Sequence, residues 1–96
     1  MGEDGHIASL FPSEPAELIN SGLIYRPVSA AKPPAHRVTL DYAPLAVAQQ
    51  VWVLASGYGK EQALRASIQA ASRTPLGRLL ALRRHTKIFT DVRLRD

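Results

Sequence analysis

The chain has 96 residues, enough for one small domain or for part of a larger one. Hydrophobic residues make up 46% and charged residues 21%, proportions typical of a folded globular protein rather than a disordered one. The absence of cysteine excludes a disulfide framework, a thiol nucleophile and a cysteine-based metal site. No apolar run approaches the roughly 20 residues that cross a bilayer, and no signal-peptide pattern is visible, so we expect a cytoplasmic protein without a membrane partner.

The net charge of +4 is unevenly distributed along the chain. Residues 1–20 carry acidic side chains and no lysine or arginine, whereas residues 65–95 carry most of the arginines. A basic segment suits nucleic acid, an anionic metabolite or simple solubility. Because aromatic residues are only 6% of the chain, we favour a solvated basic face and expect no nucleic-acid partner.

The first third of the chain predicts short elements separated by proline and glycine. Residues 7–11 are a short apolar segment after a polar loop. Ser13 is expected to begin a short helix, which Asn20-Ser21-Gly22 would end. Residues 23–29 have the composition of a strand, and Pro27 within it argues for an edge strand or an irregular one.

The middle of the chain contains the strongest strand signal. A turn at Lys32-Pro33-Pro34 leads into a short strand over residues 37–40, and Asp41 is expected to cap a helix that runs to about Gln50. Residues 51–55, Val-Trp-Val-Leu-Ala, are apolar at every position. This pattern predicts a central strand that is covered on both faces.

The last part of the chain predicts helices and strands in alternation. A turn at residues 57–59 precedes a helix over residues 60–71, a short helix is expected over 75–82, and a last strand over 87–92. Alternating helices and strands indicate an α/β fold: a mostly parallel sheet with flanking helices.

The N-terminal segment Gly2-Glu3-Asp4-Gly5-His6 is the first candidate for chemistry. Its two glycines allow a tight turn and a close approach to a ligand. His6 is a natural general base near neutral pH, and Asp4 or Glu3 could orient its ring. Taken alone, a loop histidine beside carboxylates is more often an ordinary surface group.

Two basic residues are the next candidates, both as phosphate ligands. Lys60 follows a buried strand and a glycine turn and begins a helix, where free N–H groups and the helix dipole favour an anion. Arg37, at the start of a strand, has the forked geometry that suits phosphate. An exposed cation is the competing interpretation of each. No pair of histidines and carboxylates has a helical metal-ligand spacing, so we expect no metal.

These residues belong to segments that together resemble a known family. Residues 2–12, Gly-Glu-Asp-Gly-His-Ile-Ala-Ser-Leu-Phe-Pro, resemble the signature of 6-phosphogluconolactonases, whose superfamily includes glucosamine-6-phosphate deaminase/isomerase. The deaminase branch shares Asp-Gly-His but usually lacks the Ser-Leu-Phe-Pro continuation. Residues 34–40 are similar to the family's segment of Pro, Arg, an aliphatic residue, Thr and Leu, and residues 53–60 to its strand ending in Gly-x-x-Lys. Residues 74–80 and 88–91 resemble later elements of the family.

The resemblance implies a function and a set of site residues. His6 matches the catalytic histidine, Arg37 and Lys60 match the basic residues at the sugar phosphate, and Asp4 and Gly5 complete the substrate site. The implied reaction is hydrolysis of 6-phosphoglucono-δ-lactone to 6-phosphogluconate in the pentose phosphate pathway, without a cofactor. Gly5 and its neighbours are expected to supply N–H groups to the developing oxyanion.

The resemblance covers only the later part of a family member. The family's N-terminal half, with a Ser-Gly-Gly-type phosphate loop and an Asp-Glu-Arg-type segment, has no counterpart here. We therefore expect residues 1–96 to form a single partial domain, the C-terminal part of a Rossmann-like three-layer fold, with impaired activity and self-association through an exposed sheet edge. Two other functions stay open: a non-catalytic phosphosugar-binding module and an amino-sugar-6-phosphate isomerase or deaminase.

Overall fold

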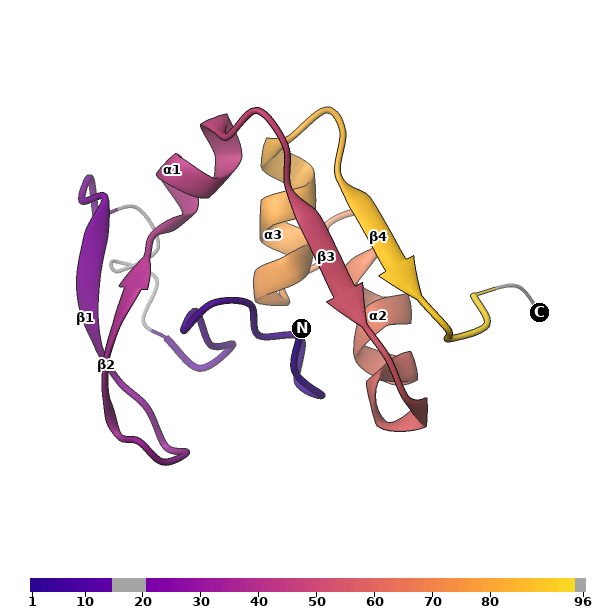
Figure 1. Ribbon diagram of the computed structural model, residues 1–96, viewed down its shortest axis with the longest axis horizontal. Helices are drawn as coiled ribbons and strands as arrows, with labels where there is room; N and C mark the ends of the chain where they lie inside the picture. Colours follow the sequence, from indigo (N-terminus) through magenta and orange to yellow (C-terminus); the bar gives the residue numbers. More distant parts are fainter. Residues whose placement is uncertain (15–20, 95–96) are drawn as a thin grey trace.

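The computed structural model of the chain describes residues 1–14 and 21–94. Within these ranges the chain forms two separate two-stranded sheets and three short α-helices (Figure 1). Most of the helix expected to begin at Ser13, residues 15–20, lies outside the described residues. None of the helices in the described ranges is long and apolar enough to cross a bilayer.

Strands β1 (Tyr25–Ser29) and β2 (His36–Leu40) form an antiparallel hairpin, with Tyr25 opposite Leu40 and Ser29 opposite His36. The expectation of a mostly parallel sheet is therefore wrong for this part of the chain. Its physical reason is the connection: residues 30–35 are too few for a parallel crossover, which needs about a dozen or more residues. Strand β1 tolerates Pro27 because the hairpin leaves it as an edge strand.

Helix α1 (Tyr42–Val47) follows β2 directly, and its N-cap is Asp41, as the sequence predicted. The Asp41 carboxylate accepts a hydrogen bond from the Tyr42 backbone N–H at 2.8 Å. The helix ends three residues before the predicted Gln50, with Ala48 as its C-cap. Arg83 Nη1 stabilises this end by donating to the carbonyls of Leu45, Ala46 and Ala48 at 2.9, 3.0 and 2.7 Å.

Strands β3 (Trp52–Ala55) and β4 (Lys87–Thr90) pair in parallel, in the register Trp52 opposite Lys87. One face of β3 is buried: Val53 and Ala55 pack with Leu64 and Leu76 into the main core. The other face carries Trp52 and Leu54, which are 61% and 70% exposed. The prediction that this strand is covered on both faces is therefore wrong for the described residues, since the helices lie on one face only.

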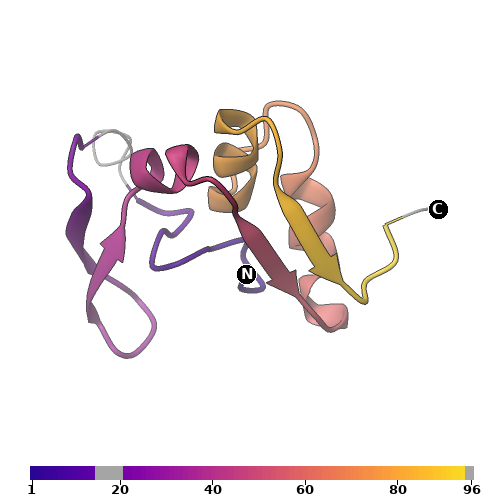
Figure 2. The same ribbon diagram turned by 45° about the horizontal axis from the view of Figure 1, so that its top comes forward.

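Helices α2 (Glu61–Ser67) and α3 (Pro75–Leu82) cover the buried face of β3 and β4 (Figures 1 and 2). Helix α3 has the predicted bounds, and its N-cap Thr74 accepts from Gly77 N–H. Helix α2 is shorter than predicted: it ends at Ser67 with Ile68 as its C-cap, and the chain adopts a positive φ of 60° four residues later, at Ala71. The described residues thus form an α/β arrangement, with helices on one side of a parallel strand pair.

Candidate active site

The loop that carries the candidate histidine is closed by its own backbone. Gly2 N–H donates to His6 O at 2.9 Å, and Gly5 N–H donates to Gly2 O at 3.0 Å. Gly5 has a φ of +86°, and a Cβ there would lie 2.9 Å from Thr74 Cβ. At Gly2 a Cβ would lie 2.1 Å from Cε1 of the His6 ring. The loop therefore needs glycine at Gly5, whereas a side chain at Gly2 would displace the imidazole of His6.

His6 and Asp4 form a close pair within this loop. His6 Nδ1 lies 2.7 Å from Asp4 Oδ1, and the same oxygen accepts from the His6 backbone N–H at 3.0 Å. Partial burial alone would raise the pKa of Asp4, but the two hydrogen bonds from His6, with the charges of His6 and Lys32, hold that pKa below its usual value. An ionised Asp4 requires a proton on Nδ1, which leaves the Nε2 lone pair of the neutral ring as a proton acceptor.

The Phe11 ring brings His6 and Arg37 to one place. The His6 and Phe11 ring centroids are 4.8 Å apart, and Arg37 Cζ lies 5.2 Å from the Phe11 centroid. Most of the Arg37 guanidinium is already used, because Nε donates to Pro34 O and Nη2 to the carbonyls of Lys32 and Pro33. Within the described part of the chain, Nη1 of Arg37 has no hydrogen-bond partner and is the nitrogen left for a ligand.

Lys60 lies on the other side of the N-terminal loop, in the 3-10 turn η2 (Tyr58–Lys60) at the end of β3. The Glu3 side chain lies against this turn, since a Cβ at Gly59 would be 1.8 Å from Glu3 Oε1. Burial and then the charge of Lys60 lower the pKa of the Met1 amino group. The tip of the β1–β2 hairpin lies at the lower left of Figure 1 and the end of β3 at the lower right, with residues 1–14 between them.

The predicted anion site before Lys60 is partly occupied by the chain itself. Asp91, just after β4, accepts from Gly57 N–H at 3.0 Å and from Ser56 Oγ at 2.8 Å. These hydrogen bonds, with the charge of Lys60, lower the pKa of Asp91. The N–H of Gly57 is thus bound to a carboxylate of the same chain.

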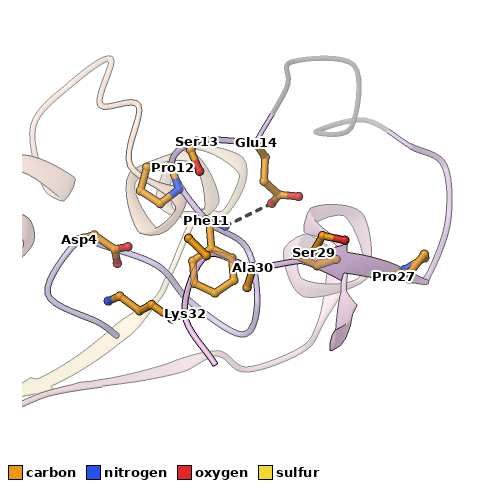
Figure 3. A pocket seen from close by; sticks show the side chains of 11 residues that line it. Asp4, Phe11, Pro12, Ser13, Glu14, Pro27, Ser29, Ala30 and Lys32 are labelled. Carbon is orange, nitrogen blue, oxygen red and sulfur yellow. Dashed lines mark hydrogen bonds between the residues drawn. The ribbon is translucent and has the colours of Figure 1, made fainter. Parts of the chain in front are cut away.

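A cavity of about 600 Å³ opens beside the pair of His6 and Asp4 (Figure 3). Pockets for small ligands have volumes of about 300–1,000 Å³, so a phosphosugar fits this size. The ammonium end of Lys32 points toward Asp4 in Figure 3. The lining residues outside the hairpin are Asp4, Phe11, Pro12, Ser13 and Glu14.

Of the predicted site residues, Asp4 lines the cavity. His6, Arg37 and Lys60 do not line it; His6 and Arg37 lie next to it through their contacts with Phe11. Phe11 and Lys32 line the cavity and were not among the predicted residues. In the sequence Lys32 stands out only as part of the turn Lys32-Pro33-Pro34.

Two of the N–H groups near the expected oxyanion position form hydrogen bonds within the loop itself. Gly5 N–H donates to Gly2 O, and His6 N–H donates to Asp4 Oδ1, so both groups are used within the loop.

Residues 1–14 and 21–94 contain no group of three metal-ligating side chains that could hold a metal ion. The arrangement can therefore accept a proton at His6 and attract an anion with nearby cations.

Comparison with known proteins identifies the family. Residues 1–89 match the family model described as glucosamine-6-phosphate isomerases/6-phosphogluconolactonase. The chain belongs to this family. The match spans every element described above except the last residue of β4, and it includes the loop of His6, the hairpin and the turn of Lys60.

Curated relatives in the family carry the name 6-phosphogluconolactonase. The protein of that name from Mycobacterium tuberculosis is 41% identical over 71 residues, which cover 74% of this chain and 29% of the relative. The human one is 39% identical over 77 residues, 79% of this chain and 30% of the relative. Probable 6-phosphogluconolactonase 1 from Arabidopsis thaliana is 37% identical over 68 residues, 71% of this chain and 25% of the relative.

The chain spans less than a third of the length of these family members. No solved structure matches it.

Proposed function

We propose that this chain carries part of a site that hydrolyses 6-phosphoglucono-δ-lactone to 6-phosphogluconate, a step of the pentose phosphate pathway. The observation that carries the proposal is the 2.7 Å contact between His6 Nδ1 and Asp4 Oδ1, which leaves Nε2 as the proton acceptor. The names of the curated relatives support lactone hydrolysis as the reaction.

In the proposed reaction, His6 acts as a general base and then as a general acid. Nε2 takes a proton from water while the water oxygen bonds to the lactone carbonyl carbon. The ring C–O ester bond then breaks, and its oxygen leaves as a hydroxyl after receiving the proton from His6. The Asp4 carboxylate stabilises the charged imidazolium between these two steps. The reaction consumes one water and requires no cofactor or metal.

The cations around the loop provide the substrate's anion contacts in this proposal. Arg37 Nη1 and Lys60 Nζ are assigned to the phosphate, and Gly5 allows the backbone to approach the sugar closely. Lys32 adds a third positive charge at the mouth of the cavity. Residues 1–14 lie between the hairpin and the end of β3, so the loop of His6 separates the two segments that carry these cations.

We also propose that the described elements are the C-terminal part of a Rossmann-like three-layer domain. The parallel pairing of β3 and β4, with α2 and α3 on one face, supports this assignment. The exposed Trp52 and Leu54 on the other face also support it, because an all-apolar strand is typical of a sheet covered on both sides.

A non-catalytic phosphosugar-binding module is the second candidate. The N–H groups of Gly5 and His6 are already hydrogen-bonded, so neither is free to stabilise an oxyanion. Such a module would bind 6-phosphogluconate without hydrolysing the lactone. The family description also includes glucosamine-6-phosphate isomerases, and a ketose product or ammonia release would identify that activity.

The test is hydrolysis of freshly prepared lactone by the full chain, followed as acid release at constant pH. The proposal predicts a rate above spontaneous hydrolysis that His6→Gln abolishes, and that His85→Gln, an exposed histidine far from the loop in sequence, does not change. A rate above background that is equal in His6→Gln and the unchanged chain contradicts the assignment of the base. Binding with no rate above background supports the second candidate.

A further inference from the structure

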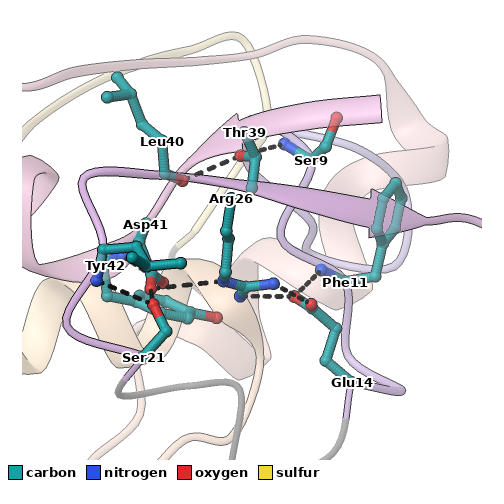
Figure 4. Close-up of polar contacts among 10 residues, drawn as sticks. Ser9, Phe11, Glu14, Ser21, Arg26, Thr39, Leu40, Asp41 and Tyr42 are labelled. Carbon is teal, nitrogen blue, oxygen red and sulfur yellow. Dashed lines mark hydrogen bonds and ion pairs between the residues drawn. The ribbon is translucent and has the colours of Figure 1, made fainter. Parts of the chain in front are cut away.

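A buried arginine joins the hairpin to the N-terminal loop (Figure 4). Arg26, on β1, is 3% exposed. Its Nη1 lies 2.6 Å from Glu14 Oε2, and its Nη2 donates to Glu14 Oε1 at 3.2 Å. On the other side, its Nε forms an ion pair with Asp41 Oδ2 at 3.3 Å, without hydrogen-bond geometry. The guanidinium is thus held between two carboxylates.

The Glu14 side of this network continues to the backbone of Phe11. Glu14 Oε1 accepts from Phe11 N–H at 3.2 Å, and the same oxygen accepts from Arg26 Nη2. The Phe11 ring in turn contacts the imidazole of His6, with centroids 4.8 Å apart. One continuous path of contacts therefore runs from β1 to the candidate general base.

The geometry of the pair favours a positioning role over a contribution to stability alone. Apolar side chains of similar volume are often as stabilising as a buried ion pair, so a buried pair is weak support for a purely stabilising role. A bidentate arginine–carboxylate contact fixes the orientation of the carboxylate group, which apolar packing does not do. Here it fixes the Glu14 carboxylate, and with it the position of the Phe11 backbone.

We propose that Arg26 and Glu14 are positioning residues: through Phe11 they hold the imidazole of His6 in place beside Asp4. The inference rests on the proposed function only in that it treats His6 as the base. Arg26 and Glu14 do not act on the substrate in this account. Asp41, the other partner of Arg26, caps α1 and has no contact with Phe11, which makes it a matched control.

The experiment is proton–carbon NMR of the histidine rings in the full chain. His36 and His85 are exposed and serve as internal references, and His36→Gln and His85→Gln assign the signals. Glu14→Gln is expected to shift the His6 ring signals, since the Phe11 ring current at His6 changes. Asp41→Asn removes a comparably buried partner of the same arginine and is expected to shift them much less.

A double-mutant cycle tests whether the effect passes through the Phe11 ring. In a chain that already carries Phe11→Leu, Glu14→Gln should cause no further shift of the His6 signals. Should Glu14→Gln unfold the chain, Arg26→Lys takes its place, with a smaller shift of His6 expected in the same direction.

Two results would overturn the proposal: equal His6 shifts for the Glu14 and Asp41 variants, or an undiminished Glu14 effect in the Phe11→Leu chain. None of these signals depends on lactone hydrolysis. An inactive chain would therefore leave this test intact, and a failure here would leave the assignment of His6 as the base untouched.

Discussion

Replacing Arg26 by methionine is expected to destabilise the chain strongly. Methionine keeps much of the side-chain volume but removes the cation between two carboxylates that are only 8% and 3% exposed, those of Glu14 and Asp41. Removing one partner of a buried ion pair typically costs about 3–5 kcal/mol. For comparison, stabilities of about 0.05–0.15 kcal/mol per residue are normal, so this loss is a large part of the total.

Urea unfolding followed by far-UV circular dichroism measures this loss as a lower midpoint with an unchanged slope. The matched control is Arg84→Met, at an exposed arginine, where a change within about 0.5 kcal/mol is expected. A loss below about 1 kcal/mol for Arg26→Met would refute the reasoning, because a loss of that size is typical of an exposed pair.

Acid dependence provides a second signature of the same network. Burial alone would raise the pKa of Asp41, but the Ser21 hydroxyl, the Tyr42 N–H and the Arg26 charge hold it below the usual 3.8. A carboxyl group with a lowered folded-state pKa contributes stability above its unfolded-state pKa and loses it as the pH falls through the folded-state value. The unchanged chain should therefore lose stability below about pH 4. Its free energy of unfolding should there approach that of Arg26→Met, because a protonated Asp41 no longer pairs with Arg26. If the two free energies of unfolding differ by the same amount across that range, Arg26 does not stabilise the charged form of Asp41.

Three other substitutions test separate parts of the structure. Gly2→Ala places a methyl group about 2 Å from the imidazole and should lower any lactone hydrolysis by about 100-fold with little change in fold, measured as rate and circular dichroism together; an unchanged rate contradicts the loop geometry. Asp91→Ala should speed amide exchange at Gly57, because the side-chain oxygen that accepts its N–H is removed; an unchanged exchange rate contradicts that contact. Trp52→Lys should abolish the concentration-dependent self-association expected in sedimentation, whereas Val47→Lys, at an equally apolar exposed site, should not; equal effects contradict association through the sheet.

Local signals predicted the elements whose ends are set by neighbouring residues. Asp41 was recognisable as an N-cap because its short carboxylate reaches the first free N–H groups of a helix. The bounds of α3 were correct because Pro75 is favoured in a first helical turn. The resemblance to the family signature made His6 and the residues beside it candidates for the site, whereas composition and spacing alone favoured an ordinary surface loop.

Contacts between distant segments were not predictable in the same way. Arg26 lies beside a proline in a short strand, and nothing in the local sequence marks it as buried, yet Glu14 and Asp41 bury it from two sides. The end of α1 depends on Arg83, far along the chain. For the outer face of β3 the sequence predicted burial, and the structure shows exposure. The apolar residues there are suited to burial, but no described residue covers them.

Titration of the full chain with 6-phosphogluconate, followed by NMR, tests the central claim most directly. The account predicts that the ring signals of His6 and the backbone signals of residues 57–60 shift together, with one dissociation constant, and that gluconate without the phosphate shifts neither at the same concentrations. Shifts in only one of the two groups, or in both with different dissociation constants, would show that His6 and Lys60 do not share a phosphosugar site.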